Sequence, residues 1–111
     1  MIGRLWRTGL QPGRGEAYES FAREVSLPMF REQDGFVGCL MSRTAESGLV
    51  FTLWRDHAAI EALGHSPSYR ATVTRILDAG LLAEPQSVEV TEVHLLDLTA
   101  LSTTAWQRCR I

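Results

Sequence analysis

The sequence has few cysteines, no long apolar run and little net charge. Its two cysteines, Cys39 and Cys109, show neither a metal-ligand spacing nor a pairing pattern, so we expect two free thiols in a reducing compartment. A net charge of −2 with dispersed arginines gives no electrostatic footprint for nucleic acid. No apolar run approaches the ~20 residues of a membrane span, and the N-terminus lacks the basic-then-apolar order of a signal peptide. We therefore expect a cytoplasmic protein that binds neither nucleic acid nor membrane.

Sequence motifs for common cofactors are also missing. The chain has no glycine-rich phosphate loop and no nucleophile elbow. His57 and His65 do not place two imidazole rings on one helix face, because Gly64 interrupts the helical pattern between them. We therefore expect neither a metal nor another cofactor.

What the chain does contain is the composition of one packed domain. Its 111 residues are 45% hydrophobic and 22% charged, which is enough apolar material for a core. Alternating and β-branched stretches predict four strands, at residues 2–8, 36–43, 49–54 and 88–98. The order of strands and helices is β-α-β-β-α-β. It predicts an α+β, ferredoxin-like protomer with an antiparallel four-stranded sheet and helices on one face.

Helix boundaries are marked by local signals. An apolar stripe through Tyr18, Phe21 and Ala22 predicts a helix from Gly15, which Pro28 is expected to end or kink. Two further helices are predicted from their caps: one from Asp56 to Gly64, and one from Ser66-Pro67 to Gly80. We expect residues 1–98 to form the domain and residues 99–111 to be a C-terminal tail.

The predicted strands are apolar on both faces of the sheet. The two predicted helices, however, can cover only one of these faces. In 49–54, for example, Leu49, Phe51 and Leu53 oppose Val50, Thr52 and Trp54. An antiparallel sheet with one wet face alternates apolar and polar residues instead, and soluble monomers rarely expose a large apolar patch. We therefore expect a homodimer in which two sheets pack face to face. The alternative is that the tail folds back over the second face.

An ordered set of motifs resembles the antibiotic biosynthesis monooxygenase family over about residues 1–98. The motifs are MIGRLWR at the start, DGFVG at residues 34–38, Trp54 followed by RDHAAIEAL, and SPSY at residues 66–69. The resemblance implies a ferredoxin-like protomer paired into a dimeric α/β barrel. It also implies, for some relatives, oxygenation of phenols or quinols without metal or flavin, in which the deprotonated substrate itself passes an electron to O₂.

The chain departs from two groups of relatives within that resemblance. Quinol-oxidising relatives often carry a His where this chain has Leu63. Haem-degrading relatives carry a Trp, a His and an Asn where this chain has Leu63, Val73 and Trp6. Haem degradation is therefore disfavoured.

Eight residues are candidates for a site between the sheet and the helices. Proton transfer is the candidate role of His65, since His titrates near neutrality, and the hydroxyl of Tyr69 is a candidate to hold a substrate oxygen. Each has a simpler alternative, a helix C-terminal charge for His65 and a core position for Tyr69. The full set is His65, Tyr69 and Trp54 as catalytic candidates, and Arg4, Trp6, Phe21, Phe36 and Leu63 as substrate-binding candidates.

Arg4 and Trp54 each allow a functional and a structural interpretation. Arg4 beside an aromatic residue suggests a site for an anion or phenolate, or else a structural cation–π pair. Trp54 is either a pocket wall or a core anchor whose indole N–H finds a partner.

Three functions follow from these observations. The first is a cofactor-independent monooxygenase that takes a small aromatic or quinol-like compound and dioxygen. The second is a non-catalytic small-molecule-binding or structural dimer of the same fold, which the apolar Leu63 favours. The third, a docking role of the tail through Trp106, rests on residues 99–111 alone.

Overall fold

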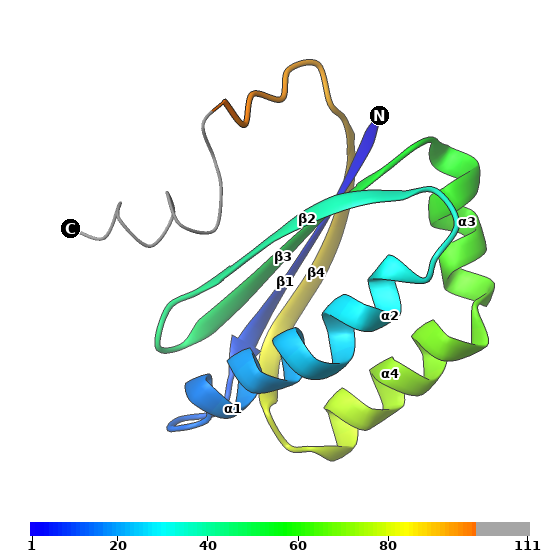
Figure 1. Cartoon of the computed structure of the whole chain (residues 1–111). Helices are drawn as coiled ribbons and strands as arrows, with labels where there is room; N and C mark the ends of the chain where they lie inside the picture. The colour runs from blue at the N-terminus through cyan, green and yellow to red at the C-terminus, as the bar shows by residue number, and fades with distance from the viewer. Residues whose placement is uncertain (100–111) are drawn as a thin grey trace.

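One antiparallel sheet of four strands forms the frame of residues 1–99, the part of the chain that the computed structural model describes (Figure 1). The strands are β1 (Ile2–Leu10), β2 (Phe36–Arg43), β3 (Ser47–Trp54) and β4 (Leu82–Glu92), and their order across the sheet is β2-β3-β1-β4. Neighbouring strands pair antiparallel, with β1 central between β3 and β4. The predicted ferredoxin-like α+β fold is confirmed.

The first helical segment runs without a break past the proline that was expected to end or kink it. It consists of α1 (Gly15–Phe21), the π-helix η1 (Ala22–Ser26) and α2 (Leu27–Arg31). The N–H of Leu27 donates to the carbonyl of Ala22, five residues back. Pro28 then falls in the first turn of α2, where a missing N–H costs little. The wider π turn therefore lets the helix continue through Pro28.

The N-caps of the other two helices match the prediction, but the end predicted at Gly64 was wrong, because the helix that follows Asp56 continues through Gly64 to His65. In α3 (His57–His65) the backbone N–H of Ala59 donates to Asp56 Oδ1 at 2.9 Å. In α4 (Pro67–Asp78) the N–H of Tyr69 donates to Ser66 Oγ at 3.4 Å. Gly80, after α4, has a positive φ of 69°, which glycine adopts without strain.

The prediction for the last strand was wrong by about six residues, since 88–98 was expected and Leu82–Glu92 is found. The strand starts early because the register shift opposite Thr8 and Gly9 leaves Glu84 and Pro85 unpaired, so the proline fits into an edge strand. It stops at Glu92 because that residue pairs with Ile2, the first residue of β1. Beyond it the only pairing is the N–H of Val93 with the carbonyl of Met1, among the described residues.

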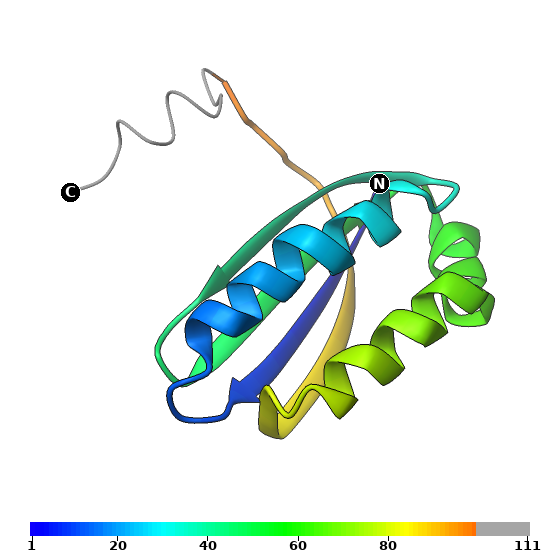
Figure 2. The same cartoon turned by 60° about the horizontal axis from the view of Figure 1, so that its bottom comes forward.

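The helices all lie on one face of the sheet, and the core fills the space between these layers (Figure 2). Its centre is Trp54, which is fully buried and donates its indole N–H to Thr52 Oγ1 at 2.8 Å. Phe30 and Phe36 pack against the indole edge-on, with ring centroids 6.3 and 5.4 Å away. Within residues 1–99 no helix is long and apolar enough to span a membrane.

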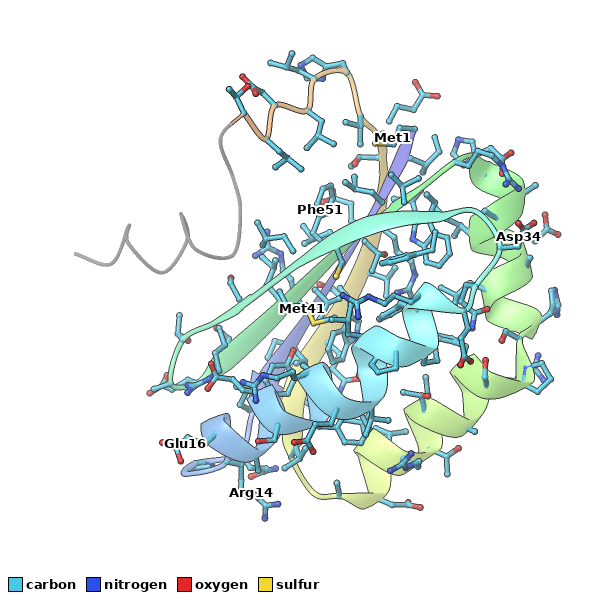
Figure 3. The ribbon with its side chains drawn as sticks, viewed as in Figure 1. Met1, Arg14, Glu16, Asp34, Met41 and Phe51 are labelled. Carbon is cyan, nitrogen blue, oxygen red and sulfur yellow. The ribbon has the colours of Figure 1, made fainter. Side chains whose placement is uncertain are left out.

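The opposite face of the sheet has no helix over it in the described part of the chain. Figure 3 shows the alternation on the β2–β3 pair, with Met41 turned toward the helices and Phe51 turned away. On the outer face Leu40 is 58% exposed, while Leu5 and Phe51 are half-buried. The outer face is therefore apolar at these positions of β1, β2 and β3, whereas β4 places Ser87, Glu89 and Thr91 on it, contrary to the prediction that every strand is apolar on both faces. The tail, which was the alternative cover for this face and a candidate to dock a partner through Trp106, lies outside the described residues from position 100 onward.

Candidate functional site

A cavity of about 190 Å³ lies between the sheet and the helices. Its floor comes from strands β1, β3 and β4, and its walls come from the first helical segment and from α4. The lining is mostly apolar, including Met29, Phe30, Val50 and Val88, with few polar groups. A largely apolar hollow with a few polar groups is the usual character of a small-molecule site.

The main polar feature of this cavity is a contact between Arg4 and Tyr69. The guanidinium Nη2 donates to the Tyr69 hydroxyl at 3.0 Å, and the guanidinium carbon lies 5.7 Å from the centre of the phenol ring. Among residues 1–99, no carboxylate lies within salt-bridge distance of Arg4. The positive charge of Arg4 therefore faces a half-buried apolar space with only a phenol to meet it.

Local rules place both side chains. Residues of a strand alternate between its faces, so Arg4 and Trp6 of β1 point to the same side, toward the helices. Ser66 fixes the start of α4, and Tyr69 falls in the first turn with its ring on the face that meets the sheet. The rest of that face continues at helical spacing through Val73 and Ile76.

Three of the eight predicted site residues line this cavity, namely Arg4, Trp6 and Tyr69. The aromatic partner of Arg4 is Tyr69, 65 positions along the chain, while Trp6 of the same strand lines the same cavity. The contact between Arg4 and Tyr69 is the structural cation–π pair that was named as the alternative for Arg4, and the anion or phenolate site at Arg4 stays a prediction.

The other five candidates lie elsewhere. Trp54 and Leu63 are buried in the core cluster, and Phe36 packs against it. Phe21 does not line the cavity and lies under the guanidinium of Arg75, whose central carbon is 6.0 Å from the ring centre. His65 is exposed at the end of α3. The functional roles proposed for these five stay predictions, and each position has a structural explanation.

Sequence reasoning missed much of the wall. Thr72, Gln86 and Val88 line the cavity, although no motif or pattern singled them out as site residues. Tyr18 and Ala22 also line it, and their place in the predicted apolar stripe of the first helix was the available signal.

Metal binding has no support in the described part of the chain. Within residues 1–99, no group of three or more His, Cys, Asp or Glu side chains is placed to hold a metal ion. All three histidines are exposed, and His94 lies beyond the end of β4. Cys39 is a free thiol whose pKa is raised by burial, an effect that the charge of Arg31 partly offsets.

Comparisons with known proteins agree with this fold. The sequence profile described as antibiotic biosynthesis monooxygenase matches residues 1–75. The chain is similar in structure to a protein of unknown function from Nitrosomonas europaea, with a TM-score of 0.71, 22% identity and coverage of 89% of this chain and 94% of that one. It is also similar to SnoaB, a cofactor-independent oxygenase from Streptomyces nogalater, with a TM-score of 0.69, 19% identity and coverage of 86% and 94%.

A third solved structure is that of Rv0793 from Mycobacterium tuberculosis, with a TM-score of 0.64, 21% identity and coverage of 89% of this chain and 98% of that one. Likeness at these identities concerns the fold. No curated protein matches the chain.

Proposed function

The chain belongs to the antibiotic biosynthesis monooxygenase family, and from this premise we propose that it is a cofactor-independent monooxygenase of small aromatic or quinol-like compounds. The observation that carries the proposal is the contact of Arg4 with Tyr69 on the wall of an apolar cavity. The oxygenase SnoaB, which has a similar fold, supports the reaction type.

The chemistry needs a phenolate, because the ionised substrate is the electron donor to O₂. One oxygen atom enters the substrate and the other leaves as water, and all four electrons come from the substrate. A fixed guanidinium in a space of low dielectric constant stabilises such a phenolate far more than water-exposed charges do. Arg4 is the group placed to do this.

Tyr69 complements Arg4 as a hydrogen-bond donor. Because its oxygen already accepts a hydrogen bond from Arg4, its own O–H is free to point into the cavity. A substrate oxygen placed there receives one hydrogen bond from Tyr69 and faces the positive charge of Arg4. This pair orients the substrate and favours its deprotonated form.

The cavity volume suggests a size class for the substrate. A cavity of about 150 Å³ holds one benzene molecule, and this cavity measures about 190 Å³. We infer a phenol or hydroquinone of one or two rings, with its ring edge against Met29, Val50 and Val88.

The test is dioxygen consumption by the purified protein over a panel of one- and two-ring phenols and hydroquinones. Tyr69→Phe removes the hydroxyl and keeps the ring, and we expect kcat/KM to fall about 10- to 100-fold, the value of a hydrogen bond to a charged group. Thr74→Ala, an exposed position on the same helix, is the matched control and keeps the wild-type rate. Absence of turnover and of binding across the panel would refute the proposal.

The second candidate function is non-catalytic binding of a small molecule by the same fold. The cavity lining favours it, because no histidine or carboxylate of residues 1–99 is among the residues that line the cavity, and Leu63, which replaces the His of some relatives, is buried in the core. Binding of a phenol with no oxygen consumption, and equal affinity in Tyr69→Phe, would establish this second function.

We also propose that the protein acts as a homodimer. The support is the outer face of the sheet, where Leu40, Leu5 and Phe51 form an apolar surface that no helix of residues 1–99 covers. Two such faces packed together bury each other's apolar groups and form the dimeric α/β barrel.

A further inference from the structure

The cavity that Arg4 and Tyr69 border has an inner end and a mouth. At the inner end Tyr69 packs against the core cluster, and Arg4 is half-buried. Three of the residues that line the cavity are exposed, namely Leu77 of α4 and Gln86 and Val88 of β4. The mouth therefore lies between the last turn of α4 and strand β4.

Strand pairing places Gln86 on the same side of the sheet as Arg4, but some distance along it. Across the β1–β4 ladder Arg4 pairs with Val90, and Thr8 pairs with Gln86. Residues that pair across a ladder point to the same face, so Gln86 points toward the helices, as Arg4 does, and both line the cavity. The four residue steps between Val90 and Gln86 correspond to about 14 Å, because a strand rises about 3.4 Å per residue.

The stretch between these two ends is largely apolar. Trp6 and Val88 line it from the sheet, and Val73 and Ile76 line it from α4. The hydroxyl of Thr72, which also lines the cavity, already donates to the carbonyl of Ser68 at 2.9 Å. The cavity thus suits an elongated apolar body with an oxygen at each end.

The side-chain amide of Gln86 is free to bind the second of these oxygens. The amides of Gln11 and Gln33 donate hydrogen bonds to backbone carbonyls, whereas that of Gln86 forms none with the residues of 1–99. A primary amide is uncharged and can both donate and accept, so it binds a hydroxyl or a carbonyl oxygen. The partner of Gln86 is therefore a neutral oxygen, in contrast to the phenolate oxygen at Arg4.

We propose that Gln86 is a specificity-determining residue, which binds a second, neutral oxygen of the substrate at the mouth of the cavity. The reacting phenol oxygen then lies at the inner end, against Arg4 and Tyr69. This inference rests on the proposed function and narrows its substrate class to elongated phenols of two rings with a hydroxyl or carbonyl group at the far end. Gln86 supplies binding and orientation, because the oxygen that it contacts does not react.

The test uses two probes of nearly the same shape, para,para′-biphenol and its analogue in which a methyl group replaces one hydroxyl. Titration in the absence of oxygen, followed by amide NMR, measures binding apart from turnover. The ratio of the two affinities is compared between the wild type and Gln86→Leu, which keeps the approximate size and removes the amide. We expect the ratio to shift about three- to tenfold toward the methyl compound, the worth of one neutral hydrogen bond.

Two further variants serve as controls. Gln11→Leu makes the same substitution at an exposed glutamine outside the cavity lining, and it leaves the ratio unchanged. Tyr69→Phe weakens both compounds by the same factor, because the hydroxyl that they share lies at the inner end. In air, Gln86→Leu raises KM for the biphenol about three- to tenfold and leaves kcat unchanged, since the lost interaction is equal in the ground state and the transition state.

An affinity ratio that is equal in the wild type and in Gln86→Leu would overturn the assignment, even if the phenol panel consumes oxygen. So would a change of the ratio in Ser26→Ala alone, because the second oxygen would then lie against the first helical segment. Absence of binding by both compounds would also overturn it. If the ratio shifts as expected and no member of the panel consumes oxygen, Gln86 keeps its role and the oxygenase proposal fails.

Discussion

Asp56 caps α3 with its own carboxylate, and this one side chain ties helix stability to pH. The hydrogen bond from the backbone N–H of Ala59 is the main reason that its pKa lies below the ordinary value of 3.8, with a smaller contribution from Arg55. A depressed pKa in the folded state means that the folded protein holds its proton less tightly than the unfolded chain does. The stabilisation is therefore complete above pH 3.8 and is lost as the pH falls through the lower folded value.

We expect Asp56→Asn to remove this part of the acid sensitivity. Asparagine caps helices nearly as well as aspartate, so the free energy of unfolding near pH 7 changes little, while its decline below pH 4 becomes shallower. Urea unfolding between pH 2.5 and 7, followed by circular dichroism, measures both. If the free energy of unfolding of Asp56→Asn declines below pH 4 as steeply as that of the wild type, other carboxylates cause the decline.

At this scale the sequence was most informative. The caps at Asp56 and Ser66 and the turn at Gly80 depend on neighbours within four residues, and all three are found as predicted. The contact between Arg4 and Tyr69, in contrast, could not be predicted from neighbouring residues. No local rule connects Arg4 to Tyr69, because the contact exists only once β1 and α4 are packed together.

Among the secondary structure elements, the β2–β3 hairpin packs closely against α1 because Gly48 has no side chain. Gly48→Ala puts a methyl group 2.6 Å from the Tyr18 hydroxyl, so either the ring or the strand has to shift. Overpacking of this kind costs about 1–3 kcal/mol in free energy of unfolding. Gly38→Ala, on β2 of the same hairpin, has nothing within 4 Å of the new Cβ and is the matched control.

We expect Gly38→Ala to leave the free energy of unfolding unchanged or slightly raised, because alanine restricts the unfolded chain more than glycine does. Chemical denaturation of the two single variants and of the Gly48→Ala/Tyr18→Phe double variant gives the comparison. The double variant is expected to recover part of the loss. Equal stability of Gly48→Ala and Gly38→Ala would contradict the close fit of Tyr18.

Element boundaries were predicted where local chemistry decides them and missed where pairing decides them. The last strand was predicted at 88–98 from its apolar pattern, whereas it starts at Leu82 and accommodates Pro85 in a bulge on an edge strand. Pro28 was expected to end or kink a helix that in fact continues through a π turn. In both cases a tertiary arrangement absorbs a residue that is unfavourable on local grounds.

For the whole molecule, the outer face of the sheet, which no helix of residues 1–99 covers, is the feature that bears on dimerisation. Leu40 on this outer face and Leu77 on α4 are matched in residue type and exposure, at 58% and 56%. If two outer faces pack together, Leu40→Asp buries a charge in the interface and weakens the dimer about 100-fold or more. Leu77→Asp, on the helical layer, leaves dimerisation unchanged.

Size-exclusion chromatography with light scattering, over a dilution series from high to low micromolar protein, measures this difference. A wild-type protein that is monomeric throughout the series would refute the dimer. So would a loss of dimer in Leu77→Asp alone, because the contact would then lie on the helical layer.

The fold could be predicted from the sequence because strand alternation and helix caps are short-range signals that repeat along the chain. The cavity could not, because its wall joins β1, β3, β4, α4 and the first helical segment, and its shape depends on how these layers pack. Trp54, Phe36 and Leu63 were candidates for the wall and are found in or against the core cluster, since large apolar residues look the same in sequence whether they enclose a space or fill it.

Tyr18 and Ala22 line both the cavity beside α4 and a hollow of about 320 Å³ between the first helical segment and β2. A larger side chain at Ala22 would take volume from the two spaces at once, and a smaller one at Tyr18 would join them. A substitution at Tyr18 or Ala22 therefore changes the shape of both spaces together. Substitutions on α4 alter only the cavity, and substitutions on β2 alter only the hollow, because each element lines one of the two spaces.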